Sequence, residues 1–557
     1  MRREPTDQRA LSGYAAALGD LDLRDAVARG LTRNDLLPKR PDDKAGGEVA
    51  NRFVASLTRD LELGRYAPSP ASFVPVPKVN NATRLAALMT LSDRAVYFAL
   101  VEPLRARIEQ ALISNDQLLW PRAIDKDKAW SALETTPLDQ EGAYIVLADV
   151  SSFYESIDHD LLAARLVELT GNVAVVQALR EFLGEIMGAR RGIPQGLDVS
   201  DVLATAYLSS VDGLMSRSLW PYFRHGDDVR IVVPDHGAGR QALHLFETGL
   251  RSVGLTLNGQ KSRILLRDTY QSHLTAVNEE REALREKIAS AREAALEHAT
   301  EEELAAIVVE AGIDEDTQWG LFYHGSVTLE DIIDQLRGVL QPTDVEVARA
   351  VFDEATSHAP DQEVDPLADE VFHVYLSTTL TRLAAGLDPH AVPLVASLIE
   401  RFPDKTELLA TYLRSVRSTD PEAVAAQVEA ALSTPYLFAW QLVWLLDTAR
   451  LLATEFDHLE FDQARAVALR VQGDEEIVWL ARAAAARYRC LTGQMGNEEM
   501  ERLWRLSPRA VQADLVAGCC DLEQVGPAGW PTRFLDSLKD DAALQVVINR
   551  NRIKPKP

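Results

Sequence analysis

Residues 221–233 read PYFRHGDDVRIVV, with two adjacent acids, Asp227 and Asp228, at a tight turn between apolar segments of strand length. Short apolar runs bounded by turn residues are typical of strands. Two carboxylates this close repel each other, so the pKa of one rises unless a cation neutralises the pair. Mg²⁺ takes oxygen ligands and commonly lies between carboxylates and a substrate phosphate. The turn alone does not establish a metal site, because most Asp-Asp pairs are solvated loop residues.

A third acid follows another apolar run upstream, in the stretch YIVLADVSSFYESID at residues 144–158. Residues 144–148 have the length and composition of a strand, and Asp149 follows them directly. An acidic residue at the end of a buried strand usually has a functional role. If this strand lies beside residues 229–233, Asp149 and Asp227 can hold two Mg²⁺ ions for in-line phosphoryl transfer.

Two loops accompany the acids. The stretch GIPQGLDVS at residues 192–200 precedes a helical pattern at 201–210, and its glycines and proline indicate a fixed loop that can present the Gln195 amide to a base pair. After the acids, GLTLNGQKS at residues 254–262 contains Lys261, which could approach a triphosphate.

In this order, the segments resemble the palm of reverse transcriptases. The resemblance covers about residues 50–275, and it implies a right-hand polymerase fold with fingers and palm. The matching segments are motif A at 149–158, motif B at 192–200, motif C at 225–228, motif D at 254–261, and the fingers stretches PKVNNATRL at 77–85 and LSDRAV at 91–96.

The resemblance implies the identity of the metal ligands. Asp149 and Asp227 match the residues that bind two Mg²⁺ ions, with Mn²⁺ as an alternative metal, and the Val150 carbonyl joins them. Asp228 matches the third acid, for which a catalytic and a supporting role both remain open.

The resemblance also implies the nucleotide-binding residues. Tyr154, five positions after Asp149, matches the gate that rejects a 2′-hydroxyl, the alternative being a plain core tyrosine. Lys78 and Arg84 match the cations that hold the triphosphate, by point charge and planar fork respectively. Lys261 matches a proton donor to pyrophosphate, and a solvated turn lysine is the alternative.

Three positions depart from the common pattern. His225 stands where most reverse transcriptases have Tyr or Phe, Leu197-Asp198 stands where Ser-Pro is usual, and residues 79–82 lack a glycine. Asp198 puts a negative charge near the expected path of template and primer. These departures bear on templated copying more than on nucleotidyl transfer.

The charge is unevenly distributed over the 557 residues, whose formal net charge is −26. Residues 1–300 contain 36 Lys and Arg against 41 Asp and Glu, whereas residues 301–557 contain 22 against 43. A protein that grips nucleic acid nonspecifically needs a basic surface. We therefore expect the acidic half to contact protein, including copies of the same chain. The alternative explanation is that the whole protein is acidic for general reasons, as many proteins of salt-tolerant bacteria are.

The chain should divide into a helical lead-in at 1–50, fingers and palm at 51–275, and an all-α, HEAT-like domain at 276–557. Helix starts are expected where an N-cap residue precedes proline, at Asp388-Pro389, Asp420-Pro421 and Thr434-Pro435. Trp440 and Trp444 are interpreted as core residues.

The remaining sequence features limit the class of protein. The three cysteines show no zinc or disulfide pattern, and Cys519 and Cys520 are interpreted as buried apolar residues. A secretory signal and a long apolar segment are both lacking, so we expect a cytoplasmic location and no membrane partner.

This architecture resembles the abortive-infection and related defence-associated reverse transcriptases of bacteria. The resemblance implies antiphage defence by DNA synthesis from dNTPs in a homo-oligomer; some members need no template and start from a protein hydroxyl, which leaves the DNA product covalently attached. One alternative is a retron-type enzyme that copies a dedicated non-coding RNA. Another is a non-catalytic helical scaffold, which the retained acids disfavour.

Overall fold

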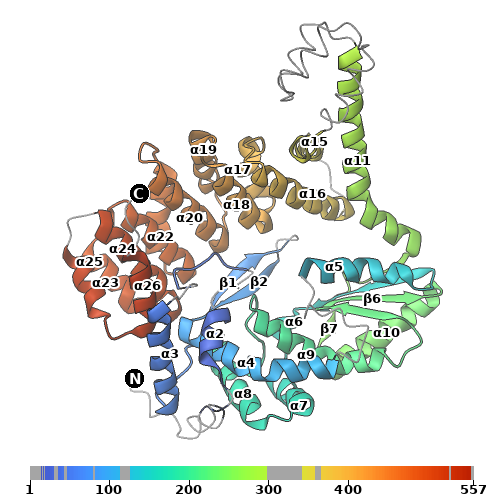
Figure 1. Cartoon of the computed structure of the whole chain (residues 1–557), viewed down its shortest axis with the longest axis horizontal. Coiled ribbons are helices and arrows are strands. Elements are labelled where there is room, and N and C mark those ends of the chain that lie inside the picture. The colour runs from blue at the N-terminus through green and yellow to red at the C-terminus, as the bar shows by residue number, and fades with distance from the viewer. Residues whose placement is uncertain are drawn as a thin grey trace, which may run out of the picture. The chain divides into compact units, whose positions relative to one another are not determined.

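The computed structural model of the chain contains two compact units (Figure 1). The first comprises residues 1–270, 398–407 and 428–557, and the second comprises residues 271–397 and 408–427. The residues that the structure describes are Tyr14, Ala17, Gly19, 21–30, 36–42, 47–78, 82–112, 126–297, 342–357, 366–525 and 529–552.

A four-stranded antiparallel sheet lies at the centre of the palm, in the order β5-β6-β3-β8. The register pairs Ala148 with Val229, which confirms the expectation that residues 144–148 lie beside residues 229–233. The side chains of Ile145, Val146 and Ile231 are fully buried, because both neighbouring strands and packed helices cover them. The strands are β3 (Tyr144–Ala148), β5 (Tyr222–His225), β6 (Asp228–Val233) and β8 (Arg263–Leu266).

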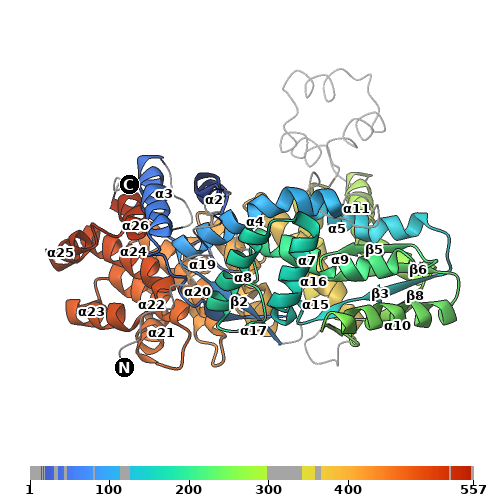
Figure 2. The same ribbon diagram turned by 90° about the horizontal axis from the view of Figure 1, so that it is seen from below.

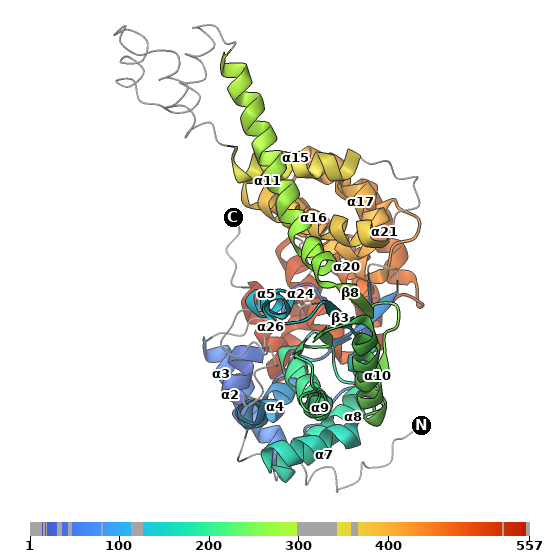
Figure 3. The same ribbon diagram turned by 90° about the vertical axis from the view of Figure 1, so that its right-hand side faces the viewer.

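Helix α10 (His236–Ser252) packs against β3, β6 and β8 (Figure 3). Gly239 allows this close approach, since a Cβ atom there would lie 2.9 Å from Ile264 Cγ2. Helix α5 (Lys126–Thr135) contacts β5.

The fingers are a β-hairpin followed by a buried helix. Strands β1 (Ser72–Pro77) and β2 (Thr83–Leu88) pair antiparallel, with Val76 opposite Arg84. Helix α4 (Leu91–Leu112) packs against four further helices (Figure 2). These helices are α2 (Leu23–Gly30), α7 (His159–Thr170), α8 (Val173–Met187) and α9 (Asp198–Met215).

The last part of the chain contributes helices to the same first unit. Trp440 and Trp444 on α20 are buried and meet edge to face, which confirms that they are core residues. Helix α22 packs against α20, α21 and α24, and α26 packs against α3 near the N-terminus. The helices are α3 (Gly47–Glu62), α20 (Ala439–Glu455), α21 (Asp462–Gly473), α22 (Trp479–Leu491), α23 (Asn497–Leu506), α24 (Arg509–Val525), α25 (Gly529–Ser537) and α26 (Ala542–Arg552).

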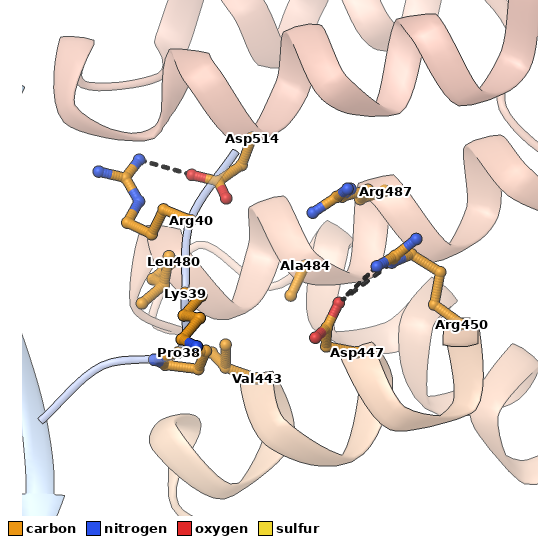
Figure 4. A pocket seen from close by; sticks show the side chains of 10 residues that line it. All are labelled: Pro38, Lys39, Arg40, Val443, Asp447, Arg450, Leu480, Ala484, Arg487 and Asp514. Carbon is orange, nitrogen blue, oxygen red and sulfur yellow. Dashed lines mark hydrogen bonds and ion pairs between the residues drawn. The ribbon is translucent and has the colours of Figure 1, made fainter. Parts of the chain in front are cut away.

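Residues 36–42, which we name the N-terminal strap, lie between the fingers and the C-terminal helices. The Arg40 side chain donates to the Met89 carbonyl and forms an ion pair with Asp514 of α24 at 2.6 Å (Figure 4). Asp42 forms an ion pair with Arg94 of α4 at 2.8 Å. Between the strap and α20, α22 and α24 is a cavity of about 30 Å³, which has room for one or two water molecules.

The second unit is helical in its described residues. The Tyr412 hydroxyl donates to the Asp388 carbonyl at 2.7 Å, and Arg349 pairs with the Asp388 carboxylate at 2.5 Å. The unit includes most of α11 (Arg267–Glu297), α15 (Asp344–Ser357), α16 (Pro366–Ala385), η3 (Val392–Leu394) and most of α18 (Thr406–Val416). Residues of α17 (Val395–Arg401) and α19 (Pro421–Leu432) belong partly to each unit.

Two of the three expected helix starts are wrong. Helix α20 begins at Ala439 rather than at Pro435, and Asp388-Pro389 leads into a turn before η3 because Asp388 Oδ1 accepts from the His390 N–H. The start at Asp420-Pro421 is confirmed, since Asp420 Oδ1 accepts from the Ala423 N–H at 3.0 Å.

Other expectations concern the cysteines and the membrane. Cys490, Cys519 and Cys520 are all buried and not disulfide-bonded, and the burial of Cys519 and Cys520 confirms their interpretation as buried residues. In the described parts of the chain, no helix combines the length and the apolar character needed to cross a bilayer. The fingers loop at residues 79–81 lies outside the described residues.

Candidate active site

The pairing of β3, β5 and β6 gathers the three predicted acids at one edge of the palm sheet. Asp149 follows Ala148, which pairs with Val229, and Asp228 immediately precedes Val229. Opposite residues of antiparallel strands have Cα atoms about 5 Å apart, so this register carries Asp149 to the hairpin turn. Gly226 has φ of 61°, a conformation that suits glycine, and allows the tight turn that presents Asp227.

The carboxylates at this edge are poorly neutralised. Burial, together with the negative charges of Asp228 and Asp149, raises the pKa of Asp227 to about 7. Burial likewise raises the pKa of Asp228, while the Arg230 guanidinium opposes the shift. A cation bound here would relieve the repulsion and return the acids to their ionised form.

Asp149 is 7% exposed and held by residues that follow the hairpin. The Asn258 side-chain amide donates to Asp149 Oδ2 at 2.7 Å, and the Asn258 N–H donates to the Asp149 carbonyl at 2.8 Å. Lys261 Nζ lies 3.5 Å from Asp149 Oδ1, although 66% of the Lys261 side chain is exposed. The pairing of β4 (Val150–Ser151) with β7 (Thr256–Leu257) brings these segments together.

Asn258 is a residue of the site that no sequence pattern identified. Its position three residues before Lys261, in a segment already assigned to the site, is the one feature of the sequence that pointed to it. A carboxamide in a turn has many local roles, so only the contact with Asp149 shows what it does.

Tyr154 lies on α6 (Phe153–Ser156), directly after the Asp149 segment. Its hydroxyl donates to Asp201 Oδ1 on α9 at 2.7 Å, and its ring meets that of Phe153 edge to face. Burial raises the pKa of Tyr154, and the charges of Asp201 and Asp227 add to this effect. Tyr154 is therefore close to the acids, and Asp201 is a second site residue that the sequence analysis did not identify.

The loop at residues 192–197 is fixed between the fingers and the Asp149 segment. The Ile193 N–H donates to the Tyr154 carbonyl at 2.9 Å, and Gln195 forms a parallel β-bridge with Ala86 of β2. Gly192 and Gly196 have φ of 87° and 93°, which only glycine adopts without strain. Gln195 is half-buried at this junction.

Lys78 and Arg84 lie on the fingers hairpin, next to the strand that meets Gln195. The Lys78 N–H donates to the Ala82 carbonyl at 2.7 Å, and both side chains are half-buried. Arg84 Nε is buried without a hydrogen-bond partner among the described residues. Within the same residues, no hydrogen bond or ion pair joins either cation to the acids.

The charge of Asp198 is neutralised within the protein. Its carboxylate pairs with Arg105 of α4 at 2.6 Å, and Arg105 also contacts Glu102. His225 lies opposite Asp228 in the hairpin, and its ring meets Trp130 edge to face. The unusual residues of motifs B and C therefore have structural partners.

A magnesium ion fits the chemistry of this edge. The donors are carboxylate oxygens, and the pKa values of Asp227 and Asp228 are raised by burial and by neighbouring acids. Across the described ranges, no group of three or more His, Cys, Asp or Glu side chains is arranged to hold a metal ion. Mg²⁺ usually keeps several waters and binds one or two carboxylates together with substrate phosphates, so a partial set of ligands suffices.

Comparison with known proteins is consistent with this geometry. Residues 76–297 match the family described as reverse transcriptase (RNA-dependent DNA polymerase), a range that includes every predicted site residue from Lys78 to Lys261. A search of curated protein sequences gives no significant match.

Among solved structures, the chain is similar to telomerase from Candida albicans, determined in complex with the TWJ fragment of telomeric RNA. The sequence identity is 12% and the TM-score is 0.30, over 74% of this chain and 66% of the telomerase chain. A similarity this distant does not bear on function.

Proposed function

We propose that this chain, whose residues 76–297 form a reverse transcriptase domain, polymerises dNTPs by metal-dependent phosphoryl transfer in bacterial antiphage defence. The enzyme class, an RNA-directed DNA polymerase, follows from that domain. The observation that carries the catalytic part is the register of β3 and β6, which directs Asp149 and the Asp227-Asp228 turn to one edge of the sheet.

Asp149, Asp227 and the Val150 carbonyl are the proposed ligands of two Mg²⁺ ions, with Asp228 as a third acid and Mn²⁺ as a substitute metal. When bound, the metal supplies charge stabilisation for the attacking and leaving oxygens. Asn258 holds the Asp149 carboxylate in position at 2.7 Å.

The remaining site residues bind the nucleotide. Lys78 and Arg84 hold the triphosphate, and the unpartnered Nε of Arg84 supports this role. Tyr154 lies under the sugar, and Gln195 contacts the templating base pair or its equivalent. Lys261 donates a proton to the departing pyrophosphate; its position 3.5 Å from Asp149 supports this assignment.

The helical part of the chain supports the proposed defence role. All elements described after Glu297 are helices, and α20, α22 and α24 pack in succession, as in a HEAT-like repeat domain. Its acidic composition favours contacts with protein over nucleic acid. We propose a cytoplasmic homo-oligomer that makes DNA without a template from a protein hydroxyl, which leaves the product covalently attached.

A second candidate is a templated enzyme that copies a dedicated non-coding RNA. The ion pair between Asp198 and Arg105 favours it, because an Asp198 carboxylate neutralised by the protein repels a template less than a free one. The two candidates share the catalytic acids and differ in whether RNA accompanies the protein.

The test begins with protein purified from its native host and treated with nuclease and then protease. Protein-primed synthesis leaves DNA attached to a peptide, and templated copying leaves a defined RNA in the untreated sample. Single dNTPs with Mg²⁺ should then be incorporated by the wild type, but not by Asp227→Asn or Asp149→Asn.

The matched control is Asp462→Asn, which removes an exposed acid on α21 that pairs with Arg465. It should keep both synthesis and protection against phage in cells. Protection that survives in Asp227→Asn while synthesis is lost would contradict the proposal and favour a scaffold.

A further inference from the structure

The first turn of α9 joins two other elements of the first unit through three side chains. Asp198 pairs with Arg105 of α4 at 2.6 Å, and the Ser200 hydroxyl lies 2.9 Å from the Tyr97 hydroxyl, also on α4. Asp201 accepts the hydroxyl of Tyr154 on α6. Of these three contacts, only the one made by Asp201 involves Tyr154, which lies close to Asp149 in the sequence.

The Tyr154 ring is restrained at both ends. At the hydroxyl end, the 2.7 Å bond to Asp201 has the length of a charge-assisted hydrogen bond, which is about twice as strong as a neutral one. At the backbone end, the Tyr154 carbonyl accepts from the Ile193 N–H at 2.9 Å. The Phe153 ring covers one edge of Tyr154 at a centroid distance of 5.5 Å.

We propose that Asp201 is a positioning residue that sets sugar selectivity by fixing the Tyr154 ring. This inference rests on the proposed function, in which Tyr154 lies under the sugar of the incoming nucleotide. An apolar surface alone rejects an added hydroxyl only about 100-fold. A ring held at its far end cannot rotate away from a 2′-hydroxyl without breaking the bond to Asp201.

The test compares kcat/KM for a dNTP with that for the matching rNTP in five proteins: wild type, Tyr154→Phe, Asp201→Ala, their double variant and Asp201→Asn. We expect Tyr154→Phe and Asp201→Ala each to lower the dNTP preference about tenfold, because each removes the hydrogen bond that holds the ring. The double variant should lose no more than either alone, because both remove the same bond. Asp201→Asn should keep most of the preference, since its carboxamide oxygen still accepts the hydroxyl.

Asp198→Ala is the matched control, because it breaks a polar contact of the same helical turn without touching Tyr154. Its dNTP preference should equal that of the wild type, and thermal melting checks that each variant folds.

Two results would overturn the inference alone: a dNTP preference unchanged in Asp201→Ala, or losses that multiply in the double variant. A wild-type protein that incorporates no dNTP would overturn the proposed function and this inference with it, so the two failures are distinguishable.

Discussion

At the turn between β5 and β6, Asp227 is half-buried beside two other carboxylates, and these surroundings raise its pKa. The acids were identified from the sequence because each follows or precedes a strand-length apolar run. Asn258, the partner of Asp149, and Asp201, the partner of Tyr154, were not identified, because these hydrogen bonds join residues that are 109 and 47 positions apart. Such pairs depend on the packing of elements rather than on local pattern.

The raised pKa of Asp227 makes the stability of the metal-free protein depend on pH. The folded state releases this proton near pH 7, whereas an aspartate in the unfolded chain releases it near its ordinary pKa of 3.8. Between these values the folded state binds more protons, so the free energy of unfolding falls as pH rises from about 4 to 7. We expect the wild-type Tm to fall more steeply than that of Asp227→Asn between pH 5 and 8.

Mg²⁺ should reverse this trend, because it binds the ionised acids. Its addition should raise the wild-type Tm more at pH 8 than at pH 6, measured by differential scanning fluorimetry. If Tm depends on pH in the same way in the wild type and in Asp227→Asn, with and without Mg²⁺, the protonation of Asp227 is not coupled to stability or to metal binding.

At the scale of elements, the sequence predicted β3 and β6 because both are short segments rich in β-branched and other apolar residues, and the structure confirms their pairing. It predicted the start of α19 from Asp420-Pro421, but the same pattern was wrong at Asp388-Pro389 and Thr434-Pro435. In the first of these, the Asp388 side chain caps a local turn instead of a helix. An N-cap residue favours the start of a helix only locally, and tertiary packing decides whether a helix follows it.

The contact between α10 and the sheet depends on Gly239. A methyl group at this position would approach Ile264 to 2.9 Å and force α10 away from the strands that carry the acids. We expect Gly239→Ala to lower the free energy of unfolding by about 1–3 kcal/mol, measured by urea denaturation.

Gly184→Ala on α8 is the control, since a Cβ there meets nothing within 4 Å. It should stabilise the protein by about 0.5–1 kcal/mol because alanine favours a helix over glycine. Equal effects of the two substitutions would show that α10 is not closely packed on the sheet.

Across the first unit, the N-terminal strap links regions far apart in the sequence. Arg40 contacts Met89 before α4 and Asp514 of α24, and Asp42 pairs with Arg94. The C-terminal helices therefore pack with the fingers in one compact unit. The predicted division of the chain at residue 276 stays a prediction. Composition revealed the change from mixed to helical structure, but it could not show which helices pack with the fingers.

Arg40→Ala should be strongly destabilising, because it leaves the buried carboxylate of Asp514 without its ion-pair partner and removes one of the two arginines beside Asp42. Removal of one partner of a buried ion pair costs about 3–5 kcal/mol. The matched control is Arg505→Ala, which breaks an exposed pair with Glu501 and should change stability by less than about 1 kcal/mol. Both values come from chemical denaturation followed by circular dichroism, and similar results for the two variants would contradict a structural role of the strap.

The most direct measurement replaces Mg²⁺ with Fe²⁺ and maps the backbone cleavage that ascorbate and peroxide produce around the bound ion. If Asp149 and Asp227 share a metal site, mass spectrometry should find cuts close to residue 149 and close to residues 227–228. Excess Mg²⁺ should suppress both sets of cuts, and both should disappear in Asp149→Asn and in Asp227→Asn. Cleavage confined to one of the two segments, or unchanged in these variants, would contradict a shared metal site and with it the proposed polymerase chemistry.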